Sequence, residues 1–160
     1  MTTWSEFAAA APELAAAGLA LLERTGPAEG LLATVRDDLP PRMHPVKVAI
    51  VDGRLLTFAI VGSAKTRDLD EDGRYALHAH LDPDIPNEFL ARGHATAVTD
   101  PALRAAAVAA WPFEVDDGYA LYDLSIDHAL LGRRASADEW PPVYTSWRAG
   151  PAARARVDDA

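Results

Sequence analysis

The sequence contains no cysteine, which excludes disulfide bonds, thiolate metal sites and cysteine nucleophiles and fits a reducing compartment. It also contains no apolar stretch long enough to span a bilayer, because Glu6, Pro12, Glu13 and Glu23 interrupt the alanine-rich start. That start has no basic segment of the kind that opens a secretory signal. We therefore expect a cytoplasmic protein that does not interact with membranes.

Positive charge is scarce. The 160 residues include 15 Lys and Arg against 24 Asp and Glu, which gives a formal net charge of −9. This balance argues against nucleic acid or an anionic membrane as the main partner. An acidic protein that binds a phosphate must gather its few cations in one place, which draws attention to Arg42, Lys47, Lys65 and Arg67.

Local signals predict two helices followed by a set of strands. Thr3 and Glu6 have the spacing of a capping box, and Pro12 suits the first turn of a second helix that runs to about Arg24. Further helical signals cover residues 64–72, as a short polar helix or turn, and residues 101–110. Alternation of apolar and polar residues predicts strands over residues 30–36, 42–51, 54–61, 74–81, 88–98, 119–131 and 143–148.

Three short features refine this pattern. Asp52-Gly53 is a strong hairpin signal between two of the strands. Pro45 requires an edge strand or a bulge, and Gly93 indicates a bulge or a close approach of two backbones. With no repeat and no linker, the chain is expected to form one mainly β domain over residues 1–149, a small closed or split barrel with peripheral helices. Residues 150–160 are expected to be a disordered tail.

The stretch "TFAIVGSAKTRDL" (residues 57–69) places Ser63 and Lys65 directly after a strand and a glycine. Backbone N–H groups of such a turn, a hydroxyl and an ammonium together form a cradle for an anion. The alternative is a solvated turn whose cations pair with Asp68 and Asp70. The composition of the turn favours this alternative, because isolated Lys/Ser turns are common.

Arg42 and Lys47 are five residues apart, so they point to opposite faces of a regular strand. A bulge at Pro45 would bring both to one side. Otherwise Arg42 caps a strand end and Lys47 protects an edge.

The remaining candidates for chemistry are weak. His78 and His80 share one face of a strand, but no third ligand lies at a recognised spacing, so we predict no metal site. There is no nucleophile elbow, dinucleotide fingerprint or P-loop, and the sequence assigns no catalytic residue. Three aromatic residues near the end of the chain could cover a flat ligand or form core or dimer contacts: Trp140, Tyr144 and Trp147.

Taken together, the order of these features resembles the flavin-binding split-barrel family that includes pyridoxamine 5′-phosphate oxidase. The features are Arg42 and Lys47 on one strand, the Asp52-Gly53 hairpin, and the strand that leads into Ser63-Ala64-Lys65. The resemblance covers about residues 29–130. It implies a six-stranded antiparallel Greek-key split barrel that forms a homodimer, with flavin mononucleotide (FMN) in a groove between the subunits.

The resemblance also implies roles for individual residues. Arg42 and Lys47 would approach the phosphate and the ring system, and Ser63 and Lys65 would hold the phosphate. The other implied cofactor-binding residues contribute mainly backbone around the ring: Met43, His44, Pro45, Val46, Phe58 and Ala59.

Departures from the family pattern limit the function that can be expected. Ala64 stands where the oxidases often have a second basic residue, Glu88 lies near a position where they often have glutamine, and "LLGRRASADEW" does not match their substrate-binding segment. We therefore expect an FMN-dependent oxidoreductase or flavin reductase that acts on another small redox substrate.

Two alternatives remain open. One is a non-enzymatic carrier or sensor for a flavin, a deazaflavin or haem, the last with His44, His78, His80 or His94 as axial ligand. The other is a barrel that has kept the fold and lost the ligand.

Overall fold

The computed structural model describes residues 1–150, so most of the tail predicted to be disordered lies outside the described residues. Helices α1 (Trp4–Ala10) and α2 (Pro12–Leu22) begin as predicted. The Thr3 hydroxyl accepts a hydrogen bond from the backbone N–H of Glu6 at 3.3 Å, and the Glu6 carboxylate accepts one from the backbone N–H of Thr3 at 2.7 Å. This capping box and Pro12 in the first turn of α2 confirm the two predicted helix starts.

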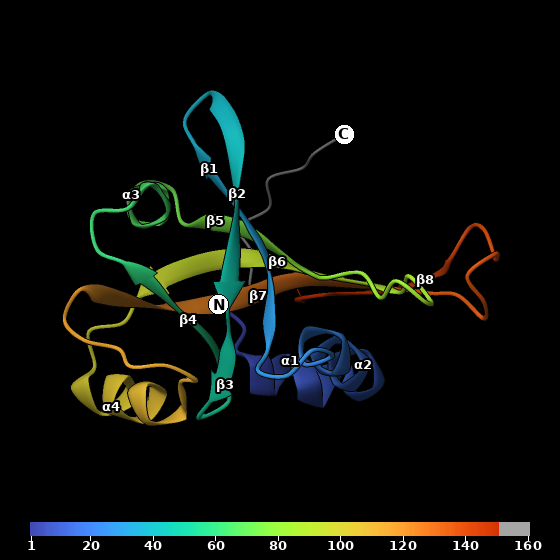
Figure 1. Ribbon diagram of the computed structural model, residues 1–160, viewed down its shortest axis with the longest axis horizontal. Coiled ribbons are helices and arrows are strands. Elements are labelled where there is room, and N and C mark those ends of the chain that lie inside the picture. Colours follow the sequence, from blue (N-terminus) through green and yellow to red (C-terminus); the bar gives the residue numbers. More distant parts are fainter. Residues whose placement is uncertain (151–160) are drawn as a thin grey trace.

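A single antiparallel sheet forms the rest of the framework (Figure 1). Its strands run in the order β2-β1-β5-β6-β7-β4-β3, with β8 paired to β7. Their bounds are β1 (Glu29–Arg36), β2 (Leu39–Lys47), β3 (Ala49–Val51), β4 (Arg54–Ile60), β5 (Arg74–Ala79), β6 (Glu88–Ala97), β7 (Tyr119–Arg133) and β8 (Val143–Arg148). The ends of this order do not pair, so the sheet curls without closing, and the predicted mainly β split barrel is confirmed.

The sheet has eight strands, whereas the resemblance implied six. The predicted strand 42–51 divides at Val48 into β2 and β3, and these lie at opposite edges of the sheet. The chain therefore leaves one edge and forms the other within a few residues. A continuous alternation in the sequence does not reveal such a change of partner, because both halves are extended.

Turn and edge residues behave as their chemistry requires. Asp52 (φ 49°) and Gly53 (φ 72°) are both left-handed and form the two-residue turn between β3 and β4, which confirms the predicted hairpin. Pro45 lies on the edge strand β2, where its missing N–H costs no ladder bond. The bulge considered at Pro45 is wrong, because the register between β1 and β2 shifts instead between Thr34 and Arg36.

The prediction for Gly93 is confirmed. A Cβ at this position would lie 1.9 Å from the carbonyl oxygen of Ser125 on β7, so the two strands approach too closely for any side chain. The register of β6 and β7 shifts beside it, where Arg92 pairs with His128 and Gly93 with Ile126. This bulge bends the two longest strands of the sheet.

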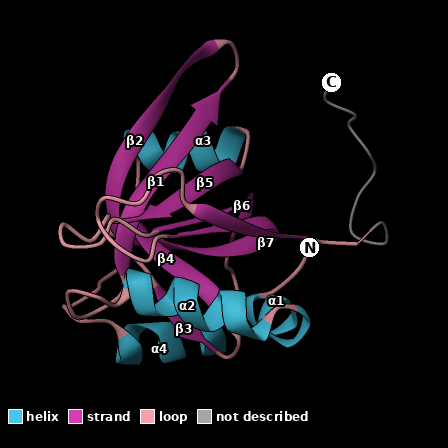
Figure 2. Ribbon diagram, turned by 90° about the vertical axis from the view of Figure 1, so that its right-hand side faces the viewer, coloured by secondary structure: helices cyan, strands magenta, loops and turns pink. Residues whose placement is uncertain are grey.

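Helices cover parts of the sheet and create two clusters of buried apolar side chains. Figure 2 shows α1, α2 and α4 (Pro101–Ala110) together on one side, whereas α3 (Ala64–Glu71) lies beside β1 at the other end. The larger cluster includes Trp4, Phe7 and Phe89, and the smaller one packs α4 against β3 and β4 around Phe58 and Trp111. Of the helices in the described part of the chain, none has the length and apolarity needed to cross a membrane; the longest, α2, has 11 residues.

Candidate functional site

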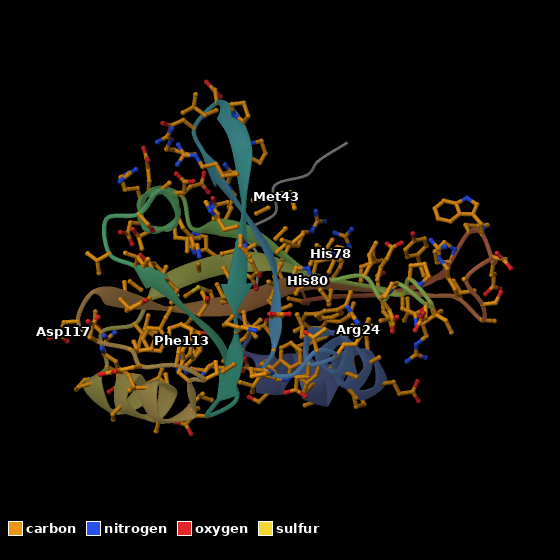
Figure 3. The ribbon with its side chains drawn as sticks, in the orientation of Figure 1. Arg24, Met43, His78, His80, Phe113 and Asp117 are labelled. Atoms are coloured by element: carbon orange, nitrogen blue, oxygen red, sulfur yellow. The ribbon has the colours of Figure 1, made fainter. Side chains whose placement is uncertain are left out.

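A cavity of about 340 Å³ opens at the end of the barrel where β2, β4 and the start of α3 come together. It combines charged and aromatic side chains. Figure 3 labels two of its residues, Phe113 beside α4 and His80 after the end of β5. The full set of lining residues is Glu29, Pro45, Val46, Lys47, Phe58, Ala59, Ile60, Lys65, His80, Trp111, Phe113 and Tyr119.

Lys65 provides an uncompensated positive charge in this cavity. It lies in the first turn of α3 and is half-buried, and its amine makes no hydrogen bond or ion pair with the residues that the structure describes. Burial lowers the pKa of the Lys65 amine below its ordinary value of 10.5. A partly desolvated amine without a counter-ion favours the binding of an anionic group.

Lys47 lines the same cavity but already has a counter-ion. Its amine donates a hydrogen bond to the carboxylate of Glu29, the residue opposite it in the β1–β2 register. The hydroxyl of Thr25 donates a second hydrogen bond to that carboxylate at 2.7 Å. These two hydrogen bonds, with the Lys47 bond the stronger cause, lower the pKa of Glu29 below its ordinary value of 4.5.

Four aromatic side chains also line the cavity and are called the aromatic wall here: Phe58, Trp111, Phe113 and Tyr119. Phe58 and Trp111 meet edge to face with ring centroids 4.8 Å apart, and Phe113 lies 6.2 Å from Trp111 and 6.0 Å from Tyr119. Helix α4 ends just before Trp111, where Pro112 cannot continue it, so the chain turns this segment onto β4. Such a wall suits a planar apolar ring.

Arg42, in contrast, is engaged on the other side of β2. Its guanidinium donates a hydrogen bond to Asp68 at 3.2 Å, and the Asp68 carboxylate is only 1% exposed. Asp68 also accepts a hydrogen bond from Thr34 at 2.8 Å. Because β2 has no bulge at Pro45, Arg42 and Lys47 point to opposite faces, as five-residue spacing on a regular strand requires.

Two other predicted residues, His44 and Ser63, make local hydrogen bonds. The His44 ring lies 3.3 Å from the Thr34 hydroxyl, and burial, together with the charges of Lys65 and Arg42, lowers the pKa of His44 below its ordinary value of 6.5. The Ser63 hydroxyl caps α3 by accepting a hydrogen bond from the backbone N–H of Thr66 at 3.3 Å.

The structure brings together six of the ten residues that the resemblance implied, since these line the cavity: Pro45, Val46, Lys47, Phe58, Ala59 and Lys65. The other four do not line it: Arg42, Met43, His44 and Ser63. Whether any of the ten binds a cofactor remains a prediction.

Sequence reasoning missed Glu29, His80 as a lining residue, and the aromatic residues that follow α4. The signal for Glu29 was its place at the start of a strand that pairs with β2, but the pairing register is not visible in the sequence. The "WPF" segment directly after the predicted helix was the available signal for Trp111 and Phe113.

Of the predicted histidine pair only His80 lines the cavity, and two of the C-terminal aromatic residues do not line it. In residues 1–150, no group of three potential ligands is placed to hold a metal ion. Trp147 packs against Phe7 with ring centroids 5.0 Å apart, and Trp140 lies exposed under the guanidinium of Arg134. They act as core and surface residues, and neither lines the cavity.

The fold is a split β-barrel of the type found in pyridoxamine 5′-phosphate oxidase-like proteins, and comparison with solved structures confirms the resemblance at the level of the fold. A NimC/NimA family protein from Clostridium acetobutylicum superposes with a TM-score of 0.63 at 16% identity, over 82% of this chain and 92% of that protein. A second protein from Clostridium acetobutylicum is related to general stress protein 26 of B. subtilis and described as of the pyridoxinephosphate oxidase family. It superposes with a TM-score of 0.59 at 12% identity, over 90% of this chain and 95% of that protein.

A haem-binding protein from Mycobacterium smegmatis superposes with a TM-score of 0.60 at 18% identity. The match covers 81% of this chain but only 57% of that protein, so the chain spans little more than half of its length. No family model matches the sequence. No curated protein shows significant similarity to it.

Proposed function

We propose that this protein is a flavin-dependent oxidoreductase that binds FMN or a close analogue in the cavity beside Lys65. The observation that carries the proposal is one cavity that is lined both by an uncompensated amine and by the aromatic wall. FMN has the matching parts, an anionic phosphate and a planar ring. The donor set therefore fits the cofactor that the resemblance implies.

The roles of the residues follow from their places. Lys65 would neutralise the anionic group, while the aromatic wall would exclude water from one face of the ring and orient it. A bound flavin supplies the redox chemistry, exchanging electrons with a small-molecule substrate. We assign no general acid or base.

We further propose that two copies of the chain assemble around this cavity. Its rim includes apolar side chains that are strongly exposed in one chain, with Ile60 at 60% and Phe113 at 46%. Exposed apolar residues beside a ligand site are typical of surfaces that a partner covers. A cytoplasmic homodimer with two sites is the assembly that we expect.

Titration with FMN, followed by quenching of the flavin fluorescence, tests the proposal. We expect binding that weakens at least tenfold in Lys65→Met, which keeps the length of the side chain and removes the charge. Arg92→Ala is the matched control, because it removes an exposed cation from β6 that does not line the cavity. Equal FMN affinity in Lys65→Met and the wild type would overturn the assignment of the site, and no binding at all would overturn the function.

Haem is the second candidate, because His80 lines the cavity and one protein of the same fold is a haem-binding protein. A haem titration of the same samples separates the two cases. A Soret band that is lost in His80→Ala, without flavin binding, would replace the flavin by haem. Flavin binding that NADH or NADPH cannot reduce would indicate a carrier rather than an enzyme.

A further inference from the structure

We infer that Glu29 is a specificity-determining residue, which makes the cavity favour a flavin with a singly charged acidic group over one with a doubly charged phosphate. The inference rests on the proposed function, since it concerns the charge of the flavin bound there. The site would select phosphodiester or carboxylate forms, and FMN would bind with an affinity that Glu29 reduces.

The Glu29 carboxylate competes with an anionic ligand for the Lys47 amine. It pairs with that amine, and both side chains line the cavity, with exposed fractions of 28% and 36%. A ligand phosphate that reaches Lys47 therefore meets the Glu29 carboxylate at the same point. The positions of the two residues are fixed, because they are opposite one another in the β1–β2 register.

Thr25 holds the Glu29 carboxylate in this position. Its hydroxyl, in the turn before β1, donates to the Glu29 carboxylate at 2.7 Å, so that the carboxylate is held from two sides. A hydrogen bond to a charged group stabilises the ionised form. The carboxylate therefore stays ionised and in place at neutral pH, and a ligand must displace it or accept its charge.

A count of formal charges gives the preferred ligand. The lysine and glutamate side chains that line the cavity are Lys47, Lys65 and Glu29, and their formal charges sum to one positive unit. Arg42 adds little, since Asp68 compensates it on the other face of β2. A phosphomonoester carries about −1.5 to −2 charges at neutral pH, whereas a phosphodiester or a carboxylate carries a single charge. The single charge matches the cavity.

The test compares three ligands that share one ring system: FMN, riboflavin 4′,5′-cyclic phosphate, which is a phosphodiester with one charge, and neutral riboflavin. Their dissociation constants are measured at pH 8 for the wild type, Glu29→Gln and Glu13→Gln. The last variant is the matched control, because it removes an exposed carboxylate of α2 that does not line the cavity.

We expect the wild type to bind the cyclic ester at least as tightly as FMN. Glu29→Gln should strengthen FMN binding about tenfold and binding of the cyclic ester about threefold, because repulsion scales with ligand charge. Riboflavin binding should not change. Thr25→Val keeps all charges but releases the carboxylate, and it should shift FMN affinity in the same direction.

Two results would overturn the inference while leaving the proposed function intact: a wild type that binds FMN more tightly than the cyclic ester, or an FMN to cyclic-ester ratio that is unchanged in Glu29→Gln. If none of the three ligands binds to any variant, the proposed flavin function itself is wrong and the inference fails with it.

Discussion

Arg42 is predicted by the resemblance to bind the cofactor, yet it pairs with the buried carboxylate of Asp68. The replacement of either partner distinguishes a structural from a ligand-binding role. Arg42→Met keeps the packing of the side chain and removes the charge, and Asp68→Asn keeps the shape of the carboxylate and removes its charge. The double variant completes a thermodynamic cycle.

The expected magnitudes follow from burial. The Asp68 carboxylate is only 1% exposed. In Arg42→Met its negative charge would be stabilised only by the hydrogen bond from Thr34 and by the Arg36 guanidinium 3.9 Å away. Removal of one partner of a fully buried pair costs about 3–5 kcal/mol. The Arg42 side chain is 35% exposed, so water screens part of this loss and we expect about 2–3 kcal/mol.

Asp68→Asn still offers an oxygen to Thr34, and we expect it to cost about 2 kcal/mol. The double variant should cost less than the sum of the single ones, with a coupling energy of about 1–2 kcal/mol. Urea denaturation at pH 7, followed by tryptophan fluorescence, measures all four proteins. Arg36→Ala removes the second cation near Asp68, at the longer distance of 3.9 Å, and it should cost less than about 1 kcal/mol.

A small loss of stability combined with a loss of FMN binding would refute the structural role of Arg42. If Arg42→Met changes the free energy of unfolding by less than about 0.5 kcal/mol and abolishes FMN binding, Arg42 serves the ligand and its pairing with Asp68 has little structural value. A loss of stability with FMN affinity retained would make Arg42 a structural residue.

Two further changes test the packing and the electrostatics. Gly18→Ala should lower the free energy of unfolding in urea by about 1–3 kcal/mol, because the added Cβ would lie 2.3 Å from the Phe89 ring. This loss should outweigh the higher helix propensity of alanine. A gain in stability would contradict the close packing of Gly18 against Phe89. The His44 pKa lies below its value of 6.5 in the unfolded chain, so the unfolded state binds more protons and stability should fall as the pH drops below about 6.5. Unfolding curves at pH 7 and pH 5 should show a smaller loss in His44→Gln, and an equal loss would contradict the assignment.

Signals that act within a few residues were read correctly from the sequence. The capping box at Thr3, the turn at Asp52 and the helix after Asp100 all begin where predicted, because each depends on backbone geometry next to one side chain. Gly93 was also informative, since a strand glycine reports a close neighbour even when that neighbour is unknown.

The partners of the charged residues could not be read in the same way. Arg42 and Asp68 are separated by 26 residues, and Lys47 and Glu29 by 18, so each pair exists only once the strands take their register. The sequence placed Asp68 in a polar turn as a neighbour of Lys65, whereas it points to β1 and β2 and is buried. Ion pairs between residues far apart in the sequence therefore determine which of the predicted cations remain free to bind an anionic ligand.

The candidate site is therefore defined by the cation that has no carboxylate partner, and not by the presence of cations as such. In a chain with nine more carboxylates than cations, a lysine or arginine on the surface has many chances to find a partner. Lys65 remains unpaired because it is half-buried in the cavity, where no carboxylate of the described chain reaches its amine. A group left unpaired at a cost in desolvation is more informative about a ligand than a paired one, since a bound anion would recover that cost.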